Sequence, residues 1–176
     1  MQLLHGGKPP AHGASVGVAT LLLWPLFTRF AGEDLSRLDL AAIQRGRLSH
    51  EDRAGWMLHA YGEAAGRVIM AENPGDFLTW EEQERRILQA RARFPEIKKA
   101  IGEMPPLDAV RGAMVRLGAL MTPEELGIDA GLLALSMRCA KDYRTRYTLL
   151  KLIDECGLQE EYMTGYPALW QSGQVK

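Results

Sequence analysis

The sequence predicts an all-α protein, a helical bundle of about six to eight helices. Val and Ile are scattered, and no long run alternates apolar and polar residues, so the strand signal is weak. Capping residues, prolines and glycines instead recur at short intervals, which is typical of short helices joined by turns. The chain has 176 residues with no internal repeat and no linker, so we expect one helical domain over residues 1–176.

The first expected helix covers residues 14–27, an apolar segment near the start of the chain. Its length of about fourteen residues is below the roughly 20 that span a membrane. It also contains Pro25 and lacks the charged region and cleavage site of a signal peptide. We therefore expect a buried helix, no membrane partner and a cytoplasmic protein. Five large apolar side chains exceed what one helix face can bury, which indicates a central helix or an interface: Leu21, Leu22, Trp24, Leu26 and Phe27.

The later helices are each predicted by a start signal and a stop signal. Starts are marked by capping residues or by proline in the first turn, and stops by glycine or proline. Two Thr-x-x-Glu capping boxes stand out, at residues 79–82 and 122–125, and the second opens only a short turn before Gly127. Residues 159–176 are less regular, although Tyr162 and Trp170 could dock them onto the body. The expected helices are 49–72, 79–93, 97–104, 105–117, 130–140 and 147–156.

Composition excludes some classes of partner. The 21 basic and 22 acidic residues give a net charge of −1, so no basic excess points to nucleic acid. The two cysteines, Cys139 and Cys156, form no CxxC pair or metal-ligand spacing and are interpreted as free thiols in a reducing cytoplasm.

The sharpest candidate for a functional residue is His12, at the head of the apolar helix. A neutral imidazole binds zinc or iron well, and the positive end of a helix disfavours its protonated form. Gly13 allows close approach of the backbone. His5 precedes it by seven residues and is interpreted as an exposed loop residue. The alternative for His12 is a plain loop histidine, since one imidazole without nearby partners is not a metal site.

Two other groups are weaker candidates. His59 and Glu63 share one face of a predicted helix at a spacing that could bind metal, but a hydrogen bond or ion pair is the favoured interpretation. His50, in the first turn of that helix, is expected at the surface. A cluster of Arg144, Arg146 and Tyr147 could contact phosphate or a partner subunit, and we favour stabilisation of helix ends. No dinucleotide or nucleotide motif is present.

Two blocks of sequence together resemble a known family. Residues 4–23 contain Pro-Pro-Ala-His-Gly-x-x-Val-Gly-Val-x-Thr. Residues 110–158 contain Val-Arg-Gly-Ala-Met-Val-Arg-Leu-Gly-Ala-Leu-Met-Thr-Pro-Glu-Glu-Leu-Gly-Ile-Asp and then Tyr-Arg-Thr-Arg-Tyr-Thr-Leu-Leu. In this order they resemble the C-terminal helical domain of the sn-glycerol-1-phosphate dehydrogenase family, within the metal-dependent alcohol dehydrogenase and dehydroquinate synthase-like superfamily. The likeness is weak between residues 34 and 104.

This resemblance implies an NAD(P)-linked interconversion of dihydroxyacetone phosphate and sn-glycerol 1-phosphate. Family members combine a Rossmann-like domain that binds NAD(P) with a helical domain, and one Asp and two His hold zinc or iron in the cleft between them. The metal acts as a Lewis acid on the substrate oxygen while hydride passes to or from the nicotinamide. The last His ligand opens the His-Gly-x-x-Val-Gly motif and maps to His12. The Arg-Tyr-Thr block maps to residues 146–148, to which we assign no chemistry.

The resemblance also implies parts that this sequence lacks. The family's Asp ligand, first His ligand and glycine-rich cofactor segment precede the motif, and none is found before His12. The residue after His-Gly, often Glu in the superfamily, is Ala14. We therefore expect part of a dehydrogenase that is inactive alone and binds neither metal nor NAD(P) tightly. The complete enzyme would take a small phosphorylated polyol, and the partner would be a missing N-terminal half or a second copy.

Two alternatives stay open. The chain could be a helical interaction or dimerisation module without catalysis. It could also be a fragment of a related polyol dehydrogenase that shares the metal site and differs in substrate.

Overall fold

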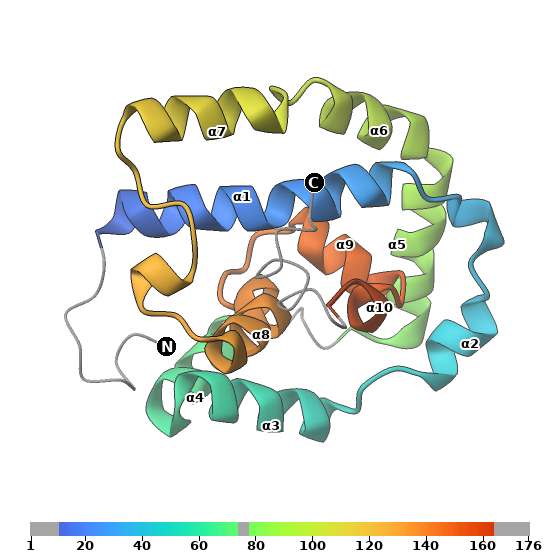
Figure 1. Ribbon diagram of the computed structural model, residues 1–176. Coiled ribbons are helices and arrows are strands. Elements are labelled where there is room, and N and C mark those ends of the chain that lie inside the picture. The colour runs from blue at the N-terminus through green and yellow to red at the C-terminus, as the bar shows by residue number, and fades with distance from the viewer. Residues whose placement is uncertain (1–10, 74–77, 164–176) are drawn as a thin grey trace.

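A computed structural model describes residues 11–73 and 78–163, and these residues form helices joined by turns, with no strand in either range (Figure 1). The predicted all-α class is therefore confirmed. The long helix α1 runs through the body, with α6 and α7 on one side and α8, α9 and α10 on the other (Figure 1). The α-helices are α1 (His12–Ala31), α2 (Leu40–Arg45), α3 (His50–Tyr61), α4 (Glu63–Glu72), α5 (Trp80–Ala92), α6 (Phe94–Gly102), α7 (Leu107–Arg116), α8 (Ala130–Cys139), α9 (Leu149–Glu155) and α10 (Gln159–Met163).

Helix α1 supplies the centre of the hydrophobic core. Among the described residues it is the one helix long and apolar enough to cross a membrane by length and composition. Its buried side chains pack within the bundle, and Phe30 meets Phe94 of α6 edge to face, with ring centroids 5.4 Å apart. The sequence placed five large apolar side chains on this helix, more than one helix face can bury. The structure buries three of them, Leu21, Leu22 and Leu26, and half-buries Trp24 and Phe27.

The single helix expected over residues 49–72 is wrong, because the chain reverses at Gly62. This residue has φ 76° and ψ 162°, a conformation that interrupts the helix and that side chains other than glycine rarely adopt. Helices α3 and α4 fold back against each other. Their backbones approach closely at Gly66, where an added Cβ would lie 3.0 Å from the Met57 carbonyl oxygen and 3.1 Å from the Leu58 Cα.

This reversal raises the number of helices above the six to eight expected, as do the short helices α2 and α10. The dipeptide Phe94-Pro95 ends α5 as predicted, but it also begins α6. Proline fits the first turn of a helix because the N–H groups there have no intrahelical acceptor. The helix expected from residue 97 therefore starts earlier.

The capping residues act as predicted. In the first box, the Thr79 hydroxyl accepts from the Glu82 N–H and the Glu82 carboxylate accepts from the Thr79 N–H. Thr122 and Glu125 make the same reciprocal pair around a single 3₁₀ turn, Glu124–Leu126. Asp129 accepts from the Leu132 N–H and starts α8. Local capping chemistry thus sets these boundaries.

The end of the described chain packs onto α1. Helix α9 starts at Leu149, after Thr148, and ends before Gly157, which has φ 73°. On α10 the buried Tyr162 hydroxyl donates to the Glu33 carboxylate at 2.6 Å, and the Arg29 guanidinium lies 4.1 Å from the centre of its ring. Docking through Tyr162 is thus confirmed, whereas Trp170 lies outside the described residues.

The close approach at Gly66 gives a test of the α3–α4 packing. Alanine favours a helix interior over glycine by about 1 kcal/mol. We expect Gly66→Ala nevertheless to lower the free energy of unfolding by about 1–3 kcal/mol, because the added methyl group meets backbone atoms of α3. The matched control is Gly55→Ala in α3, where nothing lies within 4 Å of an added Cβ. That variant should be as stable as the parent or more stable in urea unfolding, and equal behaviour of both variants would contradict the packing.

Candidate functional site

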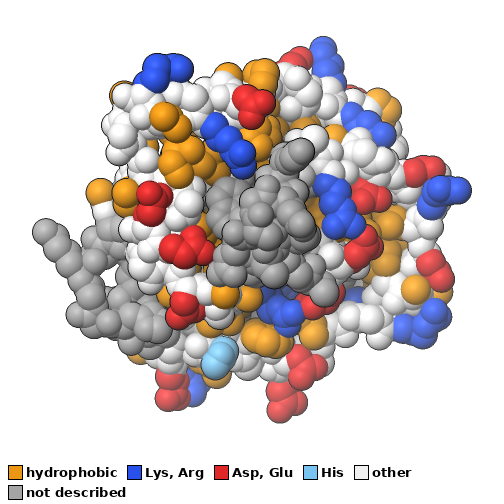
Figure 2. Space-filling view, viewed as in Figure 1, with side chains coloured by type: hydrophobic (Ala, Val, Ile, Leu, Met, Phe, Trp, Pro, Cys, Tyr) orange, Lys and Arg blue, Asp and Glu red, His pale blue; other side chains and the backbone are white. Residues whose placement is uncertain are grey.

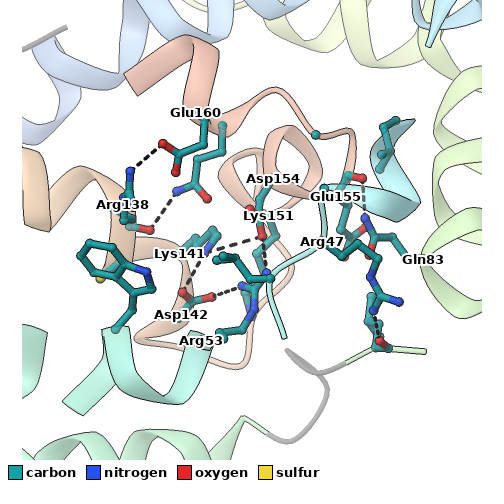
Figure 3. Close-up of a pocket in the computed structure, with 18 of the residues that line it drawn as sticks. Arg47, Arg53, Gln83, Arg138, Lys141, Asp142, Lys151, Asp154, Glu155 and Glu160 are labelled. Atoms are coloured by element: carbon teal, nitrogen blue, oxygen red, sulfur yellow. Dashed lines mark hydrogen bonds and ion pairs between the residues drawn. The ribbon is translucent and has the colours of Figure 1, made fainter. Parts of the chain in front are cut away.

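A pocket of about 480 Å³ opens between α3, the turn after α2, the 3₁₀ turn η5 (Ala140–Asp142) and α9. Sites for small ligands commonly fall in this range of volume. In Figure 3, Arg53, Lys141, Asp142 and Asp154 meet at its centre. The pocket therefore brings together charged side chains from segments that are far apart in the sequence.

Its floor is an ion-pair network shielded from water. The Arg53 guanidinium lies 3.1 Å from an Asp154 carboxylate oxygen and 3.5 Å from one of Asp142. The Lys141 ammonium lies 2.7 Å from Asp142 and 3.6 Å from Asp154. Two cations thus face two carboxylates, and all four side chains are less than a fifth exposed. Buried charges need such mutual pairing to offset their lost hydration.

A third carboxylate, the buried Glu155 of α9, flanks this floor. It accepts from the Tyr147 hydroxyl at 2.8 Å and from the Arg86 guanidinium at 2.9 Å. Its backbone oxygen accepts from the Gln83 amide at 2.7 Å. Burial raises the pKa of Glu155, and the two donors to its carboxylate partly oppose that rise.

The opposite side of the pocket is built around Arg138 of α8 (Figure 3). Its guanidinium donates to Glu160 at 2.6 Å and lies 4.4 Å from the centre of the Trp56 ring. Its backbone oxygen accepts from the Gln159 amide at 2.8 Å. These contacts tie α8, α10 and α3 together and fix the position of the Trp56 ring.

The pocket contains a thiol, but not an activated one. Cys139 lines it and is buried, and burial raises the thiol pKa to about 11. Cys156 is likewise buried, with its pKa raised to about 12. Both are free cysteines, as predicted. A nucleophilic thiol needs a lowered pKa, so this pocket is suited to binding charged molecules and not to thiol chemistry.

The structure places His12 away from this pocket, of which it is not a lining residue. It is the first residue of α1, is exposed, and has no hydrogen bond or ion pair to the described residues. Within residues 11–73 and 78–163 no three His, Cys, Asp or Glu residues are grouped closely enough to hold a metal ion. The described residues therefore do not form the three-ligand site that the resemblance implies. His5 lies outside them.

The pairing expected of His59 and Glu63 is wrong, because the break at Gly62 puts them on different helices. The His59 ring lies edge-on to Trp56, with centroids 6.3 Å apart. Glu63 pairs instead with Arg67, one turn further along α4, at 2.7 Å. His50 is exposed, as expected, and it also lines the pocket.

The expected cluster at residues 144–147 is split. The Tyr147 hydroxyl donates to Glu155, which lines the pocket. Arg144 and Arg146 are exposed, and the Arg144 guanidinium lies 4.8 Å from the centre of the Tyr143 ring.

Sequence reasoning missed Arg53, Lys141, Asp142 and Asp154. Each is a single charged residue whose partners are distant in sequence or, for the neighbours Lys141 and Asp142, point the same way only because of a 3₁₀ turn. The sequence offered one signal for this network, namely charged residues within an apolar helix. The expected helix 147–156 carries Lys151, Asp154 and Glu155 in an otherwise buried segment.

Comparisons with family models, curated proteins and solved structures find no match to this chain.

The Tyr147–Glu155 hydrogen bond can be tested by titration. The hydroxyl stabilises the ionised carboxylate, so Tyr147→Phe should raise the Glu155 pKa further above its ordinary value of 4.5. Because the folded pKa is raised, the folded state binds this proton more tightly than the unfolded state does. The stability contribution of Glu155 therefore falls as pH rises above 4.5, and falls further in the variant.

Carboxyl ¹³C NMR of Glu155 and urea unfolding at several pH values would measure both effects. The matched control is Tyr143→Phe, whose hydroxyl makes no hydrogen bond to the described residues. An unchanged Glu155 pKa in Tyr147→Phe would contradict the assignment.

Proposed function

We propose that this chain is the helical part of a cytoplasmic NAD(P)-dependent sn-glycerol-1-phosphate dehydrogenase. Two blocks of sequence support the proposal, residues 4–23 and 110–158, which resemble that family in content and order. The helical fold of the described residues agrees with the helical domain that the resemblance implies. Dihydroxyacetone phosphate and sn-glycerol 1-phosphate are then the substrate pair.

The observation that carries the proposal is the position of His12 at the start of α1. The imidazole is exposed at the first residue of a 20-residue helix whose following turns enter the core. That end of α1 has no side-chain cap and no acidic residue in its first turn. An imidazole at this exposed position can offer a nitrogen to a metal ion held by other ligands.

In this proposal the chain contributes one imidazole ligand and a rigid helical wall. Zinc or iron and NAD(P) would need further ligands and a cofactor domain from outside the described residues, because residues 11–73 and 78–163 hold no three-residue ligand group. The same arrangement would serve a related polyol dehydrogenase, which would share the metal and differ in substrate.

A second candidate function, a helical dimerisation module, is favoured by exposed apolar side chains on α1 and α7. Val16 is 50% exposed, Val115 66% and Leu117 83%. The two helices meet closely, since a Cβ on Gly17 would lie 2.8 Å from the Met114 methyl carbon. Figure 2 shows hydrophobic side chains gathered over α7 and the N-terminal part of α1. Grouped apolar side chains on a surface are typical of an interface.

The dehydrogenase proposal makes a two-part prediction about activity. The purified chain with added zinc should not reduce dihydroxyacetone phosphate with NADH or NADPH. Chain isolated with its NAD(P)-binding partner should do so, and His12→Ala should lower kcat/KM by about 100-fold or more, as for a lost metal ligand. His59→Ala, an exposed histidine on α3, is the control and should leave the rate unchanged. Turnover by the chain alone, or full activity without His12, would overturn the proposal.

The dimerisation module predicts self-association through this apolar surface. Sedimentation at micromolar concentration should show a dimer, and Leu117→Asp should shift it to monomer because a charge would be buried at the interface. Leu88→Asp is the matched control, since Leu88 is an exposed leucine on α5. A dissociation constant of tens of micromolar corresponds to an association free energy on the order of −6 kcal/mol. If the parent chain stays monomeric at that concentration, this candidate loses its support.

A further inference from the structure

We propose that the pocket between α3, the turn after α2, η5 and α9 binds a compact organic dianion, a phosphate monoester or a dicarboxylate. This inference is independent of the proposed dehydrogenase, because His12 does not line the pocket. It rests on the charge balance of the lining, on the position of Arg47, and on polar groups held in fixed orientations.

The lining carries more positive than negative charge. Among residues 11–73 and 78–163, five Lys or Arg side chains and four Asp or Glu side chains line the pocket, an excess of one cation. One of the four acids, Glu155, is paired with Arg86, which is not a lining residue. The described part of the lining is therefore cationic on balance, which suits a phosphate monoester of about −1.5 to −2 at neutral pH, or a dicarboxylate.

Arg47 is the side chain best placed to hold the anion. It follows α2, is half-buried and lies to the right of the ion-pair floor in Figure 3. One guanidinium nitrogen donates to the Leu78 backbone oxygen, which fixes the side chain. Arg47 pairs with no carboxylate among the described residues. A guanidinium has five N–H donors in a planar fork suited to carboxylate and phosphate, so donors remain for a ligand.

Lys151 of α9 adds a second, buried positive charge to the wall. Its side chain is 7% exposed, and its ammonium donates to the Arg144 backbone oxygen at 3.1 Å. Away from bulk water such a charge attracts an anion more strongly than a surface lysine would.

The floor excludes a metal cation as the ligand. Both floor carboxylates, of Asp142 and Asp154, are already held by Arg53 and Lys141 at 2.7–3.6 Å. A cation entering there would meet these two positive groups at close range, whereas an anion would meet the cationic excess of the wall.

Two side-chain amides give the pocket further polar groups. Gln83 and Gln159 each use the side-chain nitrogen to donate to a backbone oxygen, of Glu155 and Arg138 respectively. These hydrogen bonds hold both amides in place at the lining of the pocket. Arg138 lies on the opposite side from Arg47 in Figure 3, and the Trp56 ring, which also lines the pocket, is 4.4 Å from the Arg138 guanidinium.

The test is calorimetric titration of the full chain with two probes, glycerol 2-phosphate and succinate, at low and at moderate salt. At least one probe should bind with one-to-one stoichiometry in the micromolar to millimolar range, and neutral glycerol should not. Binding of glycerol 2-phosphate alone identifies a phosphate site, and binding of succinate alone a dicarboxylate site. Absence of binding by both probes would overturn the proposal.

Variants locate the site. Arg47→Gln should weaken binding at least tenfold, and Arg47→Lys should recover part of the loss because it keeps the charge without the fork. The matched control is Arg45→Gln, an exposed arginine at the end of α2 that does not line the pocket, and it should change affinity less than twofold. Circular dichroism would show that each variant is folded. Equal effects of Arg47→Gln and Arg45→Gln would overturn the assignment of the anion to this pocket.

Discussion

The ion-pair network of Arg53, Lys141, Asp142 and Asp154 is the interaction on which the geometry of the pocket depends. It joins α3, η5 and α9 across long separations in the sequence. Within this cluster the charges are balanced, and removing one partner would leave a poorly hydrated charge, at a cost of about 3–5 kcal/mol. The apolar core around α1 is continuous with α8, α9 and α10, and Phe30, Ile87 and Ile153 are fully buried in this one cluster. The pocket lies beside this core, where the charged groups of α3, η5 and α9 meet.

The sequence predicted those features whose cause is local. The capping boxes at Thr79 and Thr122 and the cap at Asp129 were predictable, because each side chain bonds to backbone N–H groups three residues away. Gly62 was missed because glycine is tolerated in helices, and only packing of α4 on α3 selects its positive φ. The network was missed for a related reason: Arg53 and Asp154 are a hundred residues apart and pair only after both helices have docked. The helical class was thus accessible from local signals, whereas the pocket depended on tertiary contacts.

His12 and the pocket are candidate functional sites that rest on different kinds of observation. His12 was found by its position at the head of an apolar helix and by a resemblance, and the described residues give it no partner. The pocket was found from geometry, and no motif points to it. The two also differ in electrostatics, because His12 lies at an uncapped helix end whose field comes from backbone N–H groups, whereas the pocket's field comes from side-chain charges. A ligand bound in the pocket therefore makes no direct contact with His12, which is not a lining residue.

The shifts in pKa favour functions in which this part of the chain binds and positions molecules. A catalytic nucleophile or base generally has a pKa moved toward the working pH. Here burial moves the thiol pKa of Cys139 to about 11 and that of Cys156 to about 12, both away from neutrality. Glu155 has a raised pKa, but its carboxylate is held between Tyr147 and Arg86, so its lone pairs are directed at the protein itself. These groups are thus suited to holding a charged molecule in the pocket, which is the role that the anion proposal gives them.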